Sequence, residues 1–235
     1  GADSTIVADA GRDGDGGKVI VWSDDATQVY GEISARGGAN GGNGGFVEAS
    51  GKRWLDFQGQ ADLRAANGSA GTLLLDPTDI TISGAANTPT SAFGSGAFTN
   101  PTTTPSNLNV ATLTAQLALG NVTISTASGL AGSGDITVNN AISYASANSL
   151  TLSANRSIAV VAGSGGISNA GGGAITLTGG GTGSIALNEG ISSGGGAISL
   201  ASGTGGVTLA AAKSIDAGKG TIASNAGGGA ASLTT

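Results

Sequence analysis

The sequence predicts an all-β protein that winds as a parallel β-helix, with about 24 residues in each coil. Three observations lead to this prediction. Glycine supplies 45 of the 235 residues. Short apolar segments alternate with Thr or Ser in the period of a strand that buries one face. These segments also recur at a regular interval, and three short strands per repeat with no helix between them are typical of a β-solenoid.

Isoleucine marks the repeat in the C-terminal half. Two series of isoleucines recur with the period of the coil. Strands of successive coils stack about 4.8 Å apart, so we expect each series to form a ladder of inward side chains. The first series is Ile142, Ile167, Ile191 and Ile215, and the second is Ile175, Ile198 and Ile222.

A β-propeller and a flexible linker are the alternatives to the solenoid. A β-propeller has longer repeats of about 40 residues with four strands each. A flexible glycine-rich linker would not place isoleucine at regular intervals. Glycine itself fits the solenoid, because tight corners need positive φ. The regular spacing favours the parallel β-helix.

The chain divides into three parts. Residues 1–83 form longer coils and hold 18 of the 24 charged side chains and both tryptophans. Residues 84–120 form an irregular insert rich in Pro, Thr and Ser, and prolines do not suit a stacked central strand. Within it we predict a short helix over 110–119, capped by Asn109 and packed on the side of the solenoid. Residues 121–235 return to short glycine-rich coils.

The composition excludes several functions. The chain has no Cys, no His and no Met, so Ser-His-Asp, Cys-His and His-ligated zinc sites are impossible. A net charge of -6 with nine Lys and Arg residues argues against a nucleic-acid partner, which needs a basic footprint. We expect no catalytic residue and no cofactor. The missing initiator Met indicates a fragment or a processed piece of a longer chain.

Acidic residues provide the candidate sites. Asp13 and Asp15 lie in a glycine–aspartate loop and are the candidate metal ligands, for calcium. The motif occurs once, whereas a calcium β-roll repeats it many times, so a solvated turn is the favoured interpretation. The other acidic pairs, which a glycosidase could use only at a defined separation, are Asp24 with Asp25 and Asp76 with Asp79.

Aromatic residues and sequons allow further interpretations. Trp22 and Trp54 could stack on sugars, but core or corner filling is favoured for both. Lys52 and Arg53 could make cation–π contacts with Trp54. Three glycosylation sequons are close to chance in such a composition, so no glycan is assigned to Asn67, Asn121 or Asn155.

Residues 1–83 resemble filamentous haemagglutinin-type exoproteins, large adhesins of the two-partner secretion pathway. The segments that carry this resemblance are Gly16-Gly-Lys-Val-Ile-Val-Trp-Ser-Asp24, Gly31-Glu-Ile-Ser-Ala-Arg-Gly-Gly38, Gly44-Gly-Phe-Val-Glu-Ala-Ser-Gly-Lys52 and Gly71-Thr-Leu-Leu-Leu-Asp-Pro77. The resemblance implies a right-handed β-helix, export through an outer-membrane partner transporter, and a secreted, bacterial cell-surface location. It also implies adhesion or biofilm formation, with host or bacterial surface glycans or proteins as ligands. The chain would lie downstream of the secretion domain of such a protein.

These observations favour a structural or adhesive surface solenoid over an enzyme. A first alternative is a filament subunit that stacks end to end, because open solenoid ends expose unpaired strands. A second is a carbohydrate-active enzyme on the same fold. A groove with converging carboxylates would distinguish that enzyme from an adhesin.

Overall fold

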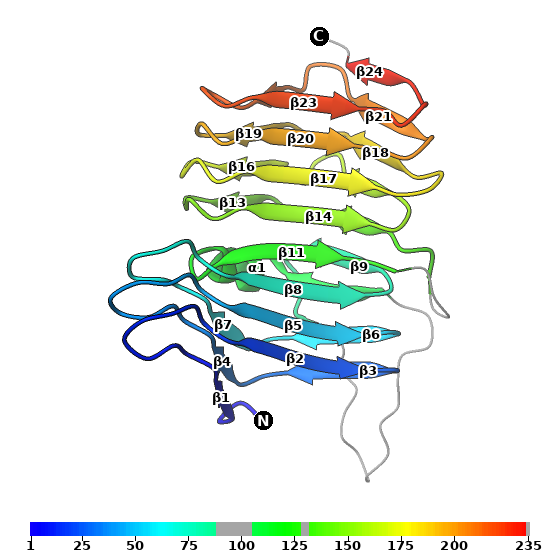
Figure 1. Ribbon diagram of the computed structural model, residues 1–235. Coiled ribbons are helices and arrows are strands. Elements are labelled where there is room, and N and C mark those ends of the chain that lie inside the picture. The colour runs from blue at the N-terminus through cyan, green and yellow to red at the C-terminus, as the bar shows by residue number, and fades with distance from the viewer. Residues whose placement is uncertain (88–104, 128–131, 234–235) are drawn as a thin grey trace.

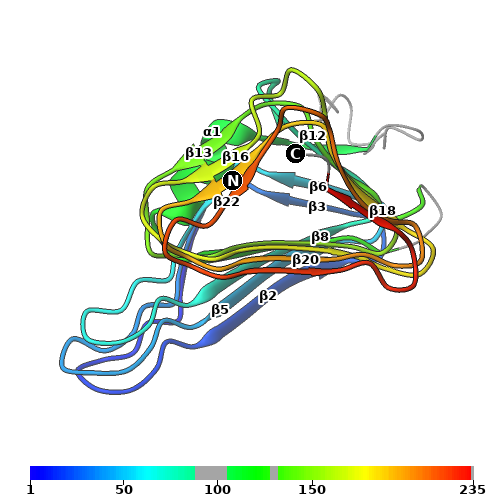
Figure 2. The same cartoon turned by 90° about the horizontal axis from the view of Figure 1, so that it is seen from above.

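The protein is an all-β parallel solenoid of about eight coils with about 26 residues in each. This computed structural model describes residues 1–87, 105–127 and 132–233, so residues 88–104 of the predicted insert lie outside the described residues. Figure 1 shows the strands stacked from the N-terminal to the C-terminal end. Viewed along the axis in Figure 2, the chain rises counter-clockwise towards the reader, which is a right-handed winding.

The first face of the solenoid is one continuous sheet of eight parallel strands. Its inward side chains are mostly Val, Leu and Ile, and Ile175 and Ile198 are fully buried in one column. Ile222 stands next in this column but is 49% exposed on the last strand of the face. The strands are β2 (Lys18–Ser23), β5 (Phe46–Gly51), β8 (Thr72–Pro77), β11 (Asn121–Ser125), β14 (Leu150–Ala154), β17 (Ile175–Gly179), β20 (Ile198–Ala201) and β23 (Ile222–Asn225).

The second face contains a reversal of the chain. Strand β10 follows β9 in the sequence, yet it pairs with the edge of β9 that faces β6. The Ser106 hydroxyl there accepts a hydrogen bond from the Leu55 N–H at 3.0 Å. The chain therefore steps back by one level. The strands in spatial order are β3 (Ala26–Val29), β6 (Trp54–Phe57), β10 (Ser106–Asn109), β9 (Ile80–Ser83), β12 (Ile136–Val138), β15 (Ile158–Val160), β18 (Ser184–Leu187), β21 (Gly206–Leu209) and β24 (Ala231–Leu233).

The third face consists of two separate sheets. The first contains β1 (Thr5–Val7), β4 (Glu32–Ser34) and β7 (Gln60–Asp62), and the second contains β13 (Ile142–Tyr144), β16 (Ile167–Asn169), β19 (Ile191–Ser193) and β22 (Ile215–Asp216). In the second sheet the register pairs Ile142 with Ile167, Ile167 with Ile191, and Ile191 with Ile215. These four side chains form one column along the axis.

Helix α1 (Val110–Leu117) lies between these two sheets. Its first turn is capped by the Asn109 side chain, which accepts a hydrogen bond from the Ala111 N–H at 2.7 Å. The predicted helix exists, but its predicted place on the side of the solenoid is wrong. Leu113 and Leu117 are buried in the core, so the helix replaces a strand in the wall of the third coil.

Helix α1 also completes the hydrogen bonding of β7. The Gln116 side-chain carbonyl accepts from the Ala61 N–H at 3.0 Å, and the Leu119 backbone carbonyl accepts from the Leu63 N–H at 3.1 Å. A buried strand edge without such partners would be unfavourable. The helix is too short to cross a bilayer, and the described part of the chain contains no helix that could do so.

Candidate binding surface on the first three coils

Three long loops project from the corner that leads into the first face. They comprise residues 8–17, 35–45 and 63–71, and we call this stack the flange. Figure 2 shows these loops extending beyond the outline of the later coils. The loops that occupy this corner in later coils are shorter, such as residues 145–149 and 170–174. The flange therefore belongs to the first three coils, which begin with β2, β5 and β8.

Glycine is required at the root of the flange. Each loop leaves the solenoid and returns to it across a backbone hydrogen bond. A Cβ atom on Gly45 would lie 2.0 Å from the Gly17 carbonyl oxygen, and one on Gly44 would lie 1.8 Å from that of Leu63. Only glycine fits such a close approach. The root bonds run from Gly17 N to Ala8 O at 2.7 Å, from Gly45 N to Ala35 O at 2.7 Å and from Gly71 N to Leu63 O at 2.8 Å.

The predicted calcium ligands lie on the returning half of the flange. One carboxylate oxygen of Asp15 accepts the Asn43 N–H at 2.6 Å, and the Asn43 side-chain oxygen accepts the Ser69 N–H at 2.9 Å. Asp13 lies in a parallel bridge opposite Gly41. Within the described ranges, no three acidic side chains gather where they could hold a metal ion. Asp15 thus links two levels of the flange.

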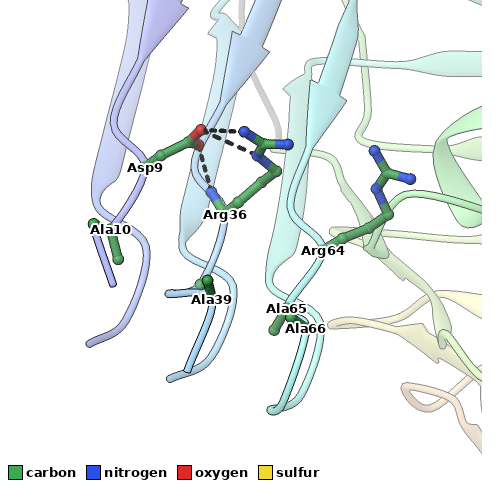
Figure 3. Close-up of a pocket in the computed structure, with 9 residues that line it drawn as sticks. Asp9, Ala10, Arg36, Ala39, Arg64, Ala65 and Ala66 are labelled. Carbon is green, nitrogen blue, oxygen red and sulfur yellow. Dashed lines mark hydrogen bonds and ion pairs between the residues drawn. The ribbon is translucent and has the colours of Figure 1, made fainter. Parts of the chain in front are cut away.

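A groove runs along the outgoing half of the flange. It encloses about 530 Å³ and crosses all three levels. Small residues form much of its surface, while Asp9, Arg36 and Arg64 supply its charged groups. Figure 3 shows Asp9 turned towards the Arg36 guanidinium, with Arg64 on the next level pointing the same way. The repeat of the solenoid therefore places two arginines in one column.

Both arginines are held by carboxylates. Arg36 pairs with Asp9 at 3.0 Å, and Arg64 pairs with Asp62 at 2.7 Å. Burial would raise the pKa of Asp9, but hydrogen bonds from Arg36 and Ser34 outweigh it and the pKa is lowered. Hydrogen bonds from Arg64 lower the pKa of Asp62 despite its burial. Both carboxylates consequently remain ionised and paired at neutral pH.

This arrangement suits binding rather than proton transfer. A general acid needs a pKa near the working pH, whereas Asp9 and Asp62 have lowered pKa values. The arginines are 52% and 59% exposed, and each uses its Nε and Nη2 groups on its carboxylate. The remaining N–H groups of a guanidinium can donate to a ligand. The groove thus offers fixed donors beside small apolar residues.

A second surface with charged and aromatic side chains lies on the outer side of β2, β5 and β8. The Lys18 ammonium lies 5.2 Å from the Phe46 ring, and the Lys52 ammonium lies 5.3 Å from the Trp22 ring. Trp22 is 51% exposed, whereas Trp54 is 1% exposed. Core filling therefore describes Trp54 but not Trp22. The cation–π contact of Lys52 involves Trp22 instead of the expected Trp54.

The predicted acidic pairs do not converge. Asp24 pairs with Lys52 at 2.8 Å and Asp25 with Arg53 at 3.0 Å, so each links two coils. Asp79 accepts the N–H groups of Gly134 and Asp135 at 2.7 Å each, as a structural cap.

Asp76 has a different environment from Asp79. Burial, with the nearby charge of Glu48, raises the pKa of Asp76. One of its carboxylate oxygens is buried without a hydrogen-bond partner. Glu48 is distant from Asp76 in the sequence and comes close because it stands on the preceding coil.

Sequence reasoning missed the arginine column and the Glu48–Asp76 neighbourhood. A signal for the column was present, because Arg36 and Arg64 occupy the same place after two successive predicted strands. No protein-family model matches the chain, and no curated protein is similar to it in sequence. The parallel solenoid is compatible with a β-helical adhesin repeat.

Proposed function

We propose that this chain is part of a secreted bacterial surface adhesin of the filamentous haemagglutinin type. In this proposal the first three coils contact the ligand, and the later coils form a rigid spacer. The distribution of side chains supports the division. The outward column of the first face contains Ile20, Glu48 and Leu74 on the first three coils, and then Thr123 and Thr151.

The flange groove is the observation that carries this proposal. A solenoid needs no projecting loops to stack its coils, yet three successive coils extend them in register. The loops are bonded to one another, as from Gly37 N to Arg64 O at 3.1 Å and from Gly44 N to Ser69 O at 2.9 Å. They present two arginines at equivalent positions. Such a rigid display favours recognition of a partner.

The proposal includes the location and partners that the resemblance implies. The chain is exported through an outer-membrane partner transporter and acts on the cell surface. It recognises glycans or proteins of host or bacterial surfaces and has no enzymatic activity. It requires no cofactor.

Binding of the purified chain to cells tests the proposal. The double variant Arg36→Gln/Arg64→Gln removes the groove donors, so we expect at least a tenfold loss of binding. Lys213→Gln is the matched control, because Lys213 is also paired with a carboxylate, Glu189 at 2.6 Å, but lies on a late coil. Wild-type protein that binds no surface, or an arginine variant that binds normally, would contradict the proposal.

Two further measurements address the alternatives. Incubation with neutral and acidic polysaccharides should release no new reducing ends or unsaturated products, and turnover would favour the enzyme. Sedimentation velocity should give a concentration-independent monomer. Growth of long assemblies with concentration would favour end-to-end filaments.

A further inference from the structure

The outer side of β2, β5 and β8 differs from the rest of its sheet. The register places Trp22 beside Ser50 and Ser50 beside Asp76, one residue per coil. The neighbouring column contains Ile20, Glu48 and Leu74 in the same order. We call the surface formed by these six residues the Trp22 face.

Trp22 and Ile20 expose apolar surface on this face. They are 51% and 52% exposed, because they stand on the same strand and both point outward. The Lys52 ammonium that lies over the indole is itself solvent-exposed and paired with the exposed Asp24. Exposed ion pairs contribute little and are readily displaced. The indole is therefore accessible to a ligand that can move Lys52 aside.

Asp76 and Glu48 give this face unused hydrogen-bonding capacity. One oxygen of Asp76 is buried and has no hydrogen-bond partner. Glu48 accepts a hydrogen bond from the Ser50 hydroxyl at 2.8 Å through one of its two oxygens. A buried carboxylate oxygen without a donor is unfavourable. The buried oxygen is out of reach of a ligand, but ligand hydroxyl groups would donate to the second oxygen of Asp76 and to the second oxygen of Glu48.

The size and charge of the face select the class of ligand. A stable protein interface buries about 800 Å² on each partner, which exceeds a patch with two exposed apolar side chains. A sugar ring matches a single indole, because one face of the ring is apolar while its rim carries hydroxyl groups. Glu48 and Asp76 would repel an anionic chain. A neutral, hydroxyl-rich glycan is small enough for the patch, matches the indole with the apolar face of a sugar ring, and is not repelled by the two carboxylates.

We propose that the Trp22 face binds a neutral glycan chain, with the indole stacked on a sugar ring and Glu48 and Asp76 accepting from its hydroxyl groups. This inference rests on the proposed adhesive function, since it names a ligand class for the same coils. The site is distinct from the flange groove, whose lining residues belong to the outgoing halves of the loops.

Tryptophan fluorescence of the whole chain provides the test. Trp54 is buried and Trp22 is exposed, so acrylamide quenching reports on Trp22. A soluble neutral glucan should protect Trp22 from quenching with a saturable dependence, and an anionic polysaccharide such as alginate should not. No protection by neutral glucans, or stronger protection by alginate, would overturn the inference.

Affinity electrophoresis in gels that contain the same glucan measures the variants without relying on the indole signal. Trp22→Ala, Glu48→Gln and Asp76→Asn should each reduce retardation at least tenfold. Thr151→Ala, on the same outer face of a later coil, is the matched control and should leave retardation unchanged. Normal retardation of all three variants would overturn the inference, after circular dichroism has verified that they fold.

The failure of this inference can be separated from the failure of the proposed function. If the whole chain binds cells through the arginine groove but ignores neutral glucans, only the glycan inference fails. If the chain binds neither cells nor glucans, both fail. If Trp22→Ala loses glucan retardation and the arginine double variant retains it, the two sites are independent as proposed.

Discussion

Replacement of Gly45 by Ala should destabilise the flange strongly. The added Cβ would lie 2.0 Å from the Gly17 carbonyl oxygen and 2.7 Å from the Gly16 carbonyl carbon. Both atoms are backbone, so no side-chain rotation can relieve the contact, and the levels of the flange must move apart. Overpacking of this kind costs about 1–3 kcal/mol or more. In a chain of this size we expect a melting temperature lower by roughly 2–12 °C.

The matched control is Gly41→Ala, near the tip of the same loop. A Cβ atom on Gly41 would have no neighbour within 4 Å, so its effect should fall within about 0.5 kcal/mol of zero. Thermal unfolding followed by circular dichroism compares the two variants, and limited proteolysis locates any opening. Cleavage should increase within residues 35–45 for Gly45→Ala alone. Equal melting temperatures for both variants would refute the steric account of the paired glycines.

Three further predictions concern the core, the helix and an acidic group. Ile198→Ala should lower the free energy of unfolding by about 2–5 kcal/mol, because Ile198 is fully buried. The control Ser199→Ala lies on the outer side of the same strand and should change this free energy by less than about 1 kcal/mol. Denaturant titrations measure both variants. Gln116→Leu should accelerate hydrogen exchange at Ala61, because the Ala61 N–H loses its acceptor. That loss costs about 1–3 kcal/mol, but the variant also removes the Gln116 amide nitrogen, which is buried without a partner, so the net change in the free energy of unfolding should be smaller. Asp76 has a pKa raised above its ordinary value of 3.8, so the folded state binds this proton more tightly than the unfolded chain. The stabilisation of the folded state by this bound proton is fully present at pH values below the ordinary pKa of Asp76. It is lost as the pH rises through the raised pKa of the folded state. Asp76→Asn should therefore raise the melting temperature at pH 7 relative to wild type and reduce its fall between pH 4 and pH 7.

The solenoid was predictable because its period is a local property of the sequence. Every coil must place an apolar residue at the same inward position, and Ile142, Ile167 and Ile191 record this requirement directly. Asn109 also revealed the start of α1, since a cap acts within one helical turn. The predicted period reflects the short C-terminal coils. The flange loops lengthen the early coils and raise the average to about 26.

The position of the insert was not predictable from the same pattern. Strand β10 lies between β9 and β6, at a height along the axis that the chain has already passed. Its alternating side chains predict a strand with one buried face, but they do not indicate which strands it pairs with. The core position of α1 depends on the space between β7 and β13, which only the stacked coils define. Leu113 and Leu117 form an apolar stripe on the helix, and such a stripe could pack either against the outside of the solenoid or into its core.

The candidate site was hidden for a different reason. Acidic residues that are neighbours in the chain, such as Asp24 with Asp25, are evident from the sequence, but the solenoid brings together residues that are one coil apart. Glu48 and Asp76, and likewise Arg36 and Arg64, stand on adjacent coils. Aligning the first coils on their longer period would have revealed both pairs. The burial and the ionisation of these four side chains could still not be derived from that alignment, because both depend on neighbouring residues from three strands.

Helix α1 explains why the flange has three levels. The C-terminal end of the helix leads through Gly120 directly into β11, and a Cβ atom on Gly120 would lie 2.9 Å from the Cβ atom of Leu63. No projecting loop fits in this tight connection, so Arg64 stands on the last level of the flange. A second cleft of about 590 Å³ opens above it, between Arg64 and Ser69 on one side and Asn121 and Asn148 on the other. The segment that completes the edge of β7 therefore also separates the coils with projecting loops from the later coils, whose loops at this corner are shorter.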